Sequence, residues 1–96
     1  MVEVGVRRIV YSDLDYNGHM NNTRYPDMLC DFLPDGTVPH VRVMHFSYLK
    51  EGAYGAQLRI LRGERMTENG KAYLFHTLNE SGELCLEAEV ITDLEV

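Results

Sequence analysis

The sequence predicts an α+β fold in which a five-stranded, curled antiparallel sheet wraps around one central helix, in the order β-α-β-β-β-β. Two observations lead to this prediction. One segment in the first third of the chain has the apolar period of a helix, and from residue 41 onward each segment alternates as strands do. A helix lying across the concave face of a curled sheet buries both apolar surfaces compactly. At 96 residues we expect a single domain over 1–96.

The first element is a predicted strand over residues 2–11. It is rich in β-branched side chains, and its alternation puts Val2, Val4 and Val6 on one face. A polar loop over residues 12–22 follows this strand.

The second element is a helix with one buried face. Asn22 or Thr23 can cap it, and Pro26 requires that its start lie close by, because proline is tolerated only in the first helical turn. The sequence Pro-Asp-Gly at 34–36 ends it. Its apolar side chains recur at the spacing i, i+3, i+4, i+7, i+8: Tyr25, Met28, Leu29, Phe32 and Leu33.

Four further strands complete the predicted sheet. They cover residues 41–49, 56–64, 71–78 and 83–92. The turn at 79–82 suits an antiparallel hairpin in which Gly82 supplies a positive φ. The last strand has a clear core face: Leu84, Leu86, Ala88 and Val90. Such a sheet keeps free edges over a thin core, so we expect self-association or a linked second copy.

Composition narrows the classes of function. Nine Lys and Arg against fifteen Asp and Glu give a formal charge of -6, which argues against a nucleic-acid partner. No apolar run reaches the ~20 residues of a membrane-spanning helix, and no signal peptide is visible. Cys30 and Cys85 show no framework spacing, so we expect reduced thiols in a soluble cytoplasmic protein. The four histidines share no metal-ligand spacing, and we expect no metal and no cofactor.

The loop over residues 12–22, Ser-Asp-Leu-Asp-Tyr-Asn-Gly-His-Met-Asn-Asn, concentrates polar side chains between the first strand and the helix. Turn chemistry explains much of it, since aspartate bonds its own backbone in loops, Asn17-Gly18 is a turn signal, and asparagine caps helices. His19 is the residue that turn chemistry leaves unexplained.

The same segment carries a resemblance to a known family. A strand, then DLDYNGHMNNTRY, then a helix, then a strand ending FSYLKEGAYG, resembles the hotdog-fold acyl-acyl carrier protein thioesterases over nearly the whole chain. Those proteins usually carry two hotdog units, and this chain is similar to the second. The family's D-x-N-x-H pattern falls on Asp15, Asn17 and His19, and an asparagine pair follows at 21–22.

A second match lies after the strand that follows the helix. The family has an acidic position there, and the sequence YLKEG offers Glu51. In the plant members a cysteine comes next, whereas this chain has Gly52, so the sequence does not support a cysteine nucleophile.

The resemblance implies hydrolysis of fatty acyl thioesters of acyl carrier protein, in fatty acid biosynthesis. The implied catalytic residues are Asp15, Asn17, His19 and Glu51. The base that takes a proton from water is left open among the two carboxylates and the imidazole. Asn17 can position a water or a carbonyl without titrating. Free N–H groups near residues 22–25 would stabilise an oxyanion.

The implied substrate-binding residues are Asn22, Tyr25, Met28 and Phe46, where the helix and sheet would part around an acyl chain. The expected partners are an acyl carrier protein or coenzyme A thioester and a second hotdog unit, in a homodimer or a longer chain.

Two alternative functions stay open. One is a homodimeric acyl-CoA thioesterase with Asp15 as nucleophile or base, and the other is a non-catalytic module that binds acyl chains or holds an assembly together.

Overall fold

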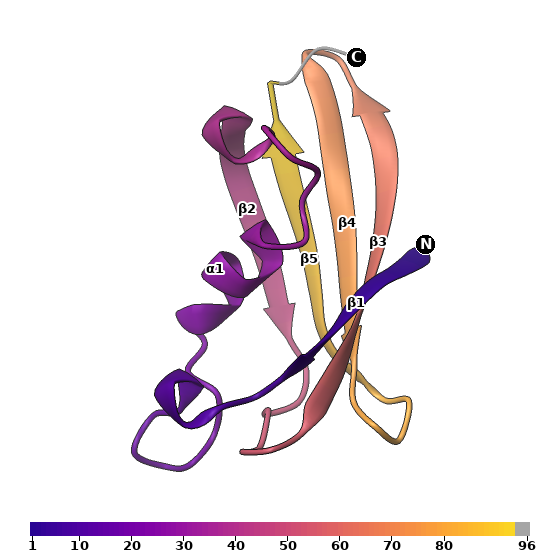
Figure 1. Cartoon of the computed structure of the whole chain (residues 1–96). Coiled ribbons are helices and arrows are strands. Elements are labelled where there is room, and N and C mark those ends of the chain that lie inside the picture. The colour runs from indigo at the N-terminus through magenta and orange to yellow at the C-terminus, as the bar shows by residue number, and fades with distance from the viewer. Residues whose placement is uncertain (94–96) are drawn as a thin grey trace.

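A computed structural model describes residues 1–93, and in this part of the chain it shows the predicted order of one α-helix and five strands (Figure 1). The helix is α1 (Arg24–Cys30), and short 3-10 turns lie at Tyr11–Asp13 and Val38–His40. The strands are β1 (Val2–Arg8), β2 (Val41–Tyr48), β3 (Gln57–Thr67), β4 (Gly70–Leu78) and β5 (Leu84–Thr92). The predicted α+β fold class is therefore confirmed.

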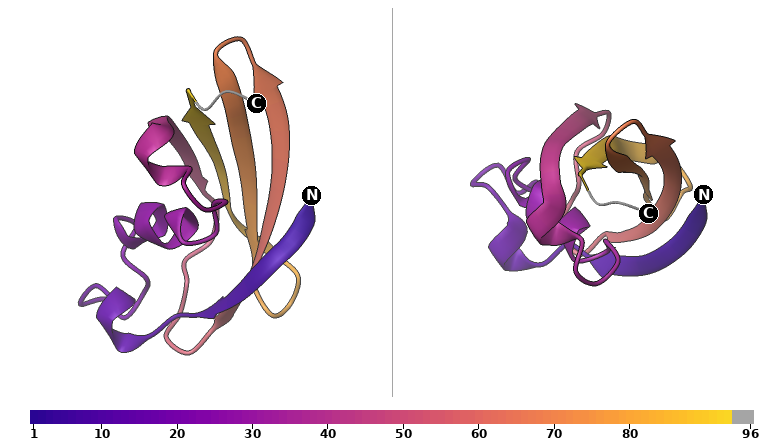
Figure 2. Two further views of the ribbon diagram at one scale, coloured as in Figure 1. Left: turned by 45° about the horizontal axis from the view of Figure 1, so that its top comes forward. Right: turned by 90° about the horizontal axis from the view of Figure 1, so that it is seen from above.

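The five strands form one antiparallel sheet in the order β1-β3-β4-β5-β2. Seen from above, the sheet is strongly curled (Figure 2). The strands β1 and β2 are its two edges, so both present backbone groups that are not paired within the sheet. None of the helices in the described part of the chain is long and apolar enough to cross a membrane.

The core lies between α1 and the inner face of the sheet. Tyr25, Met28 and Leu29 are buried on α1, as their spacing predicts. They belong to one apolar cluster with buried side chains of the sheet: Leu58, Ile60, Tyr73, Phe75, Leu86, Ala88 and Val90. The helical stripe and the alternation of β5 thus face each other across a single core.

The prediction that the three valines of β1 share one face is wrong. Val2 is 66% exposed and Val6 is 51% exposed, whereas Val4 packs against the core. The pairing of β1 with β3 shifts register between residues 3 and 5, so a bulge changes which side chains face inward. The Phe32 ring fills the space beside Gly5, where a Cβ atom would lie 2.4 Å from Phe32 Cε1. A glycine at this position lets the ring close the core.

The start of α1 also differs from the prediction. Thr23 occupies the N-cap position, but its side chain makes no capping hydrogen bond. Instead, Asn21 Oδ1 accepts hydrogen bonds from the Thr23 N–H at 3.0 Å and the Thr23 hydroxyl at 2.9 Å. The helix ends at Cys30, and tighter turns carry the chain on to Leu33, which is buried.

Candidate active site

The loop between β1 and α1 is closed by its own backbone. Leu14 and Met20 form an isolated antiparallel bridge, and the Asp15 N–H donates to the His19 carbonyl oxygen at 2.9 Å. The Gly18 N–H donates back to the Asp15 carbonyl oxygen at 3.1 Å, and Gly18 has a φ of 82°. This left-handed conformation favours glycine, which is why Asn17-Gly18 is an effective turn signal here.

The loop docks against the connection between β2 and β3, at the same end of the molecule (Figure 1). The Met20 N–H donates to the Gly52 carbonyl oxygen at 2.7 Å, and His19 forms an isolated antiparallel β-bridge with Ala53. This docking brings Glu51 to His19, with 3.1 Å between Glu51 Oε2 and His19 Nδ1. Both side chains remain accessible, His19 at 40% exposure and Glu51 at 74%.

A hollow of about 320 Å³ opens beside this pair. Four of the predicted site residues line it, namely Asp15, His19, Asn22 and Glu51. The other lining residues are Met20, Asn21, Tyr48, Leu49 and Lys50. The structure therefore brings the two halves of the predicted site, the loop and the end of β2, to one surface.

Asp15 and Asn17 have different positions within the loop. Asp15 Oδ1 accepts the Asn17 N–H at 2.9 Å and the His19 N–H at 3.4 Å, so this carboxylate also shapes the turn. The Asn17 side chain is exposed and is not part of the lining. Of the three alternating polar residues in the loop, Asp15 and His19 converge on the hollow and Asn17 does not.

The N–H groups at the start of α1 are mostly occupied, contrary to the expectation of free donors over residues 22–25. The Arg24 N–H donates to the Asn21 carbonyl oxygen at 2.9 Å, and the Tyr25 N–H donates to the Asn22 carbonyl oxygen at 3.3 Å. The Thr23 N–H is held by the Asn21 side chain, as described above. Asn22 lines the hollow, and no hydrogen bond from its N–H is seen within residues 1–93.

Three predicted substrate-binding residues lie behind the hollow. Tyr25 and Met28 are buried in the core and Phe46 is half-buried, and none of them lines it. Tyr48 connects Tyr25 and Phe46 to the hollow, because its ring packs edge-on against Tyr25 at 5.7 Å and stacks on Phe46 at 5.9 Å between centroids. The Tyr48 hydroxyl donates to the Asn22 carbonyl oxygen at 3.1 Å.

The Tyr25 hydroxyl is buried beneath Gly52 and has no hydrogen-bond partner among residues 1–93. Burial raises the pKa of Tyr25 to about 12. A Cβ atom on Gly52 would lie 3.1 Å from this hydroxyl oxygen and 2.5 Å from Ile9 Cδ1. A glycine at position 52 therefore leaves room for the Ile9 side chain and the Tyr25 hydroxyl.

Two residues near the site were missed from the sequence. Lys50 lines the hollow and pairs with Glu83, with 2.7 Å between Nζ and Oε2. Asp13 is 1% exposed and forms two hydrogen bonds with Arg7, each 2.8 Å long. These bonds hold the pKa of the Asp13 carboxyl below its usual value. Aspartate in a loop is ordinarily a turn former, so no local signal indicated that this one is buried.

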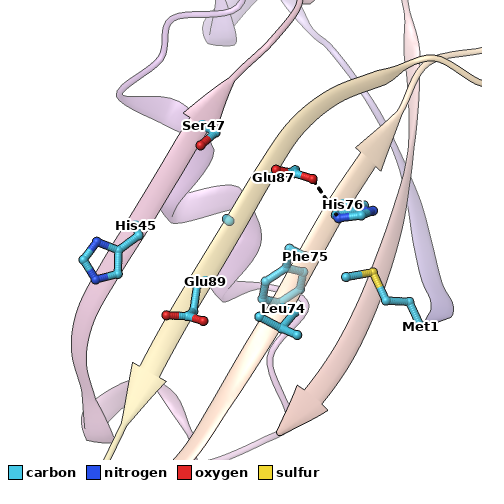
Figure 3. A pocket seen from close by; sticks show the side chains of 9 residues that line it. Met1, His45, Ser47, Leu74, Phe75, His76, Glu87 and Glu89 are labelled. Carbon is cyan, nitrogen blue, oxygen red and sulfur yellow. Dashed lines mark ion pairs between the residues drawn. The ribbon is translucent and has the colours of Figure 1, made fainter.

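A second hollow, of about 380 Å³, lies on the outer face of the sheet. Ser47, Glu87 and His76 lie in a row across β2, β5 and β4, and His76 Nε2 is 3.4 Å from Glu87 Oε1 (Figure 3). None of the predicted site residues lines this hollow. Across residues 1–93, no group of three or more His, Cys, Asp and Glu side chains is placed to hold a metal ion.

Comparison with known proteins points to one family. The model of the acyl-ACP thioesterase C-terminal domain matches residues 3–93. No curated protein sequence matches the chain. A crystal structure of an acyl-ACP thioesterase from Bacteroides thetaiotaomicron is similar with a TM-score of 0.82 and 26% identity, over 93% of this chain and 36% of that one. The chain thus spans about a third of that relative's length.

Two shorter proteins share the fold. A Staphylococcus aureus protein solved in complex with CoA has a TM-score of 0.78 at 18% identity, over 90% of this chain and 73% of that one. A probable thioesterase from Escherichia coli has the same TM-score, 0.78, and 18% identity, over 90% and 77% of the two chains. The hotdog fold implied by the sequence resemblance is confirmed by these likenesses.

Proposed function

We propose that this chain, which belongs to the acyl-ACP thioesterase C-terminal domain family, carries the catalytic loop of a thioesterase that hydrolyses fatty acyl thioesters of acyl carrier protein. The observation that supports the proposal most directly is the 3.1 Å contact between His19 and Glu51 at the hollow that Asp15 also lines. An imidazole oriented by a carboxylate is an arrangement that activates water or another nucleophile.

In the proposed reaction His19 is the general base. Glu51 Oε2 lies 3.1 Å from Nδ1, and in this proposal it accepts a hydrogen bond from Nδ1–H, so that Nε2 is the nitrogen that accepts a proton. Nε2 takes a proton from water as the water oxygen attacks the thioester carbonyl carbon. The tetrahedral intermediate then collapses, the C–S bond breaks, and the proton passes from Nε2 to the leaving sulfur. The products are a free fatty acid and the thiol of the carrier.

The other polar groups at the hollow have supporting roles in this proposal. Asp15 holds the His19 N–H through Oδ1 and presents its carboxylate to the same hollow, where it can orient the attacking water. The Asn22 N–H is the proposed donor to the oxygen on which negative charge develops. Asn17 contributes its backbone N–H to the Asp15 turn, and its proposed role is to hold the Asp15 carboxylate in place.

The acyl chain would enter beside Tyr48, whose ring leads from the hollow to Tyr25 and Phe46. Met28 lies in the same core behind them. Binding of a long chain therefore requires α1 and the sheet to separate at these side chains. Lys50 gives the hollow a cation next to Glu51, and it is the proposed contact for the acidic carrier.

The alternative carrier is coenzyme A. The likeness to a Staphylococcus aureus protein solved with CoA favours testing it, since that chain is of similar size to this one. The chemistry at the thioester carbon is the same for either carrier. What differs is the contact beyond the thiol, a phosphorylated nucleotide in one case and an acidic protein in the other.

A second hotdog unit completes the proposed assembly. The chain corresponds to about a third of the Bacteroides thetaiotaomicron relative, and its sheet has open edges at β1 and β2. Pairing with another unit, from a second copy or from the same longer protein, would cover an edge of the sheet.

The experiment measures free thiol released from acyl carrier protein and coenzyme A thioesters by the wild type, Asp15→Ala and His19→Ala. His45→Ala is the matched control, because His45 is an exposed histidine on the outer face of the sheet. We expect turnover by the wild type and the control, with a loss of at least about 100-fold in both site variants. Equal rates in all four proteins would refute the proposal. Co-purifying lipid without turnover would indicate a non-catalytic acyl-binding module.

A further inference from the structure

We infer that Asp13 is a positioning residue, which together with Arg7 and Arg24 fixes the loop that presents Asp15 and His19. The catalytic consequence of this inference rests on the proposed function. The structural part of the inference depends on contacts of the Asp13 carboxylate, and none of the predicted site residues takes part in them through its side chain.

The Asp13 carboxylate is held from two elements. Arg7 of β1 donates two parallel hydrogen bonds to it, Nη1 to Oδ2 and Nη2 to Oδ1, each 2.8 Å long. The Val10 N–H donates to Oδ2 at 2.9 Å, and Arg24 Nε at the start of α1 lies 3.8 Å from Oδ1. A two-pronged pair of this kind fixes orientation as well as distance. Asp13 therefore ties the end of β1 to the first turn of α1.

The backbone of the same residue closes the base of the loop. The Asn21 N–H donates to the Asp13 carbonyl oxygen at 2.8 Å, directly beside the bridge between Leu14 and Met20. The side chain thus anchors Asp13 to the sheet, and its carbonyl anchors the far end of the loop. Asp13 does not line the hollow, so any effect on substrate passes through the residues it positions.

The tip of the loop has no apolar anchor of its own. Tyr16, Asn17 and Gly18 are all exposed, and Tyr16 is fully so. The positions of Asp15 and His19 are therefore set by the turn's hydrogen bonds and by the two ends of the loop. A shift of about 1 Å at a catalytic group can cost about 100-fold in rate, so an anchor at the base matters for turnover.

Asp13→Asn tests the inference because it keeps the shape of the side chain and removes its charge. Arg7→Lys is the second variant, since it keeps the charge and loses the two-pronged geometry. Glu89→Gln is the matched control. It breaks the pair between Arg65 and Glu89, 2.6 Å long, on the outer face of the sheet. Two readouts are measured: amide hydrogen exchange by segment, and kcat and KM for thioester hydrolysis.

We expect Asp13→Asn to raise exchange over residues 14–22 by at least about tenfold and to leave β4 and β5 unchanged. The kcat should fall by at least about tenfold while KM stays within about twofold. Arg7→Lys should give a smaller change in the same segment, and Glu89→Gln none. Unchanged loop exchange in Asp13→Asn would overturn the inference, as would an equal rise in the loop and the sheet. A wild type without turnover would count against the proposed function alone, because exchange still decides the role of Asp13.

Discussion

His19 and Glu51 lie 3.1 Å apart, Nδ1 to Oε2, although one belongs to the loop before α1 and the other follows β2. The contact exists because the loop and the β2–β3 connection share backbone hydrogen bonds, including Met20 N–H to the Gly52 carbonyl at 2.7 Å. In the proposed reaction Nε2 is the proton acceptor, and the predictions below follow from that assignment and from the contacts that surround the pair.

The first prediction separates water activation from covalent catalysis by Asp15. A single turnover with enzyme in excess, run in water enriched in oxygen-18, should place the label in the fatty acid and leave the Asp15 carboxylate unlabelled. Asp15 Oδ1 already accepts two backbone N–H groups, which suits a positioning role. Mass spectrometry of the peptide containing Asp15 checks this, and label in that peptide would mean that Asp15 is the nucleophile.

The second prediction concerns Gly52. Because a Cβ atom there would lie 2.5 Å from Ile9 Cδ1, Gly52→Ala and Gly52→Cys should each lower the free energy of unfolding by about 1–3 kcal/mol. The measurement is denaturant unfolding of both variants and the wild type. Activity is compared between the two variants, whose side chains differ by the thiol. A higher kcat in Gly52→Cys than in Gly52→Ala would show that this site can use a cysteine after all.

The third prediction is a pH dependence of stability from Asp13. Hydrogen bonds from Arg7 lower the pKa of this carboxyl below its ordinary value of 3.8, so the folded state favours the ionised form. The resulting stabilisation is fully present above about pH 5 and is lost as the pH falls below 3.8. The difference in unfolding free energy between the wild type and Asp13→Asn should therefore be constant at neutral pH and shrink in acid. A difference that grows in acid would contradict this sign.

The fourth prediction is self-association. With β1 and β2 both open and Val2, Val6 and Val43 exposed on them, we expect the chain to form a dimer in solution. Light scattering coupled to gel filtration measures this directly. A monomer that persists at high protein concentration would indicate that the second unit must come from elsewhere in a longer protein.

Local sequence patterns predicted most of the fold, because helices and strands are indicated by the spacing of apolar residues that lie close together in the chain. The spacing of Tyr25, Met28 and Leu29 reports the buried face of a helix, and each strand after residue 41 starts within one residue of its predicted position. The faces of β1 could not be predicted in this way. Its bulge is coupled to the Phe32 ring beside Gly5, which is a contact between segments far apart in the chain.

The candidate site also combines features that local sequence patterns predicted with features that depend on contacts between distant segments. The D-x-N-x-H pattern predicted the loop residues and the acidic position predicted Glu51, and in the structure Asp15, His19 and Glu51 line one hollow. The burial of Asp13 depends on Arg7, whose approach is set by the register of β1 on β3. No pattern within the loop reports that register. The position of the Asn17 side chain likewise depends on the turn conformation.

The most direct test of the account is a double-mutant cycle on the pair at its centre, measured as kcat for hydrolysis of an acyl carrier protein thioester. If His19 and Glu51 act as one unit, His19→Ala and Glu51→Gln should each reduce kcat, by about 100-fold or more for His19→Ala. The double variant should then be no slower than His19→Ala alone. Losses that multiply in the double variant would contradict the account, because they would mean that the two side chains act independently.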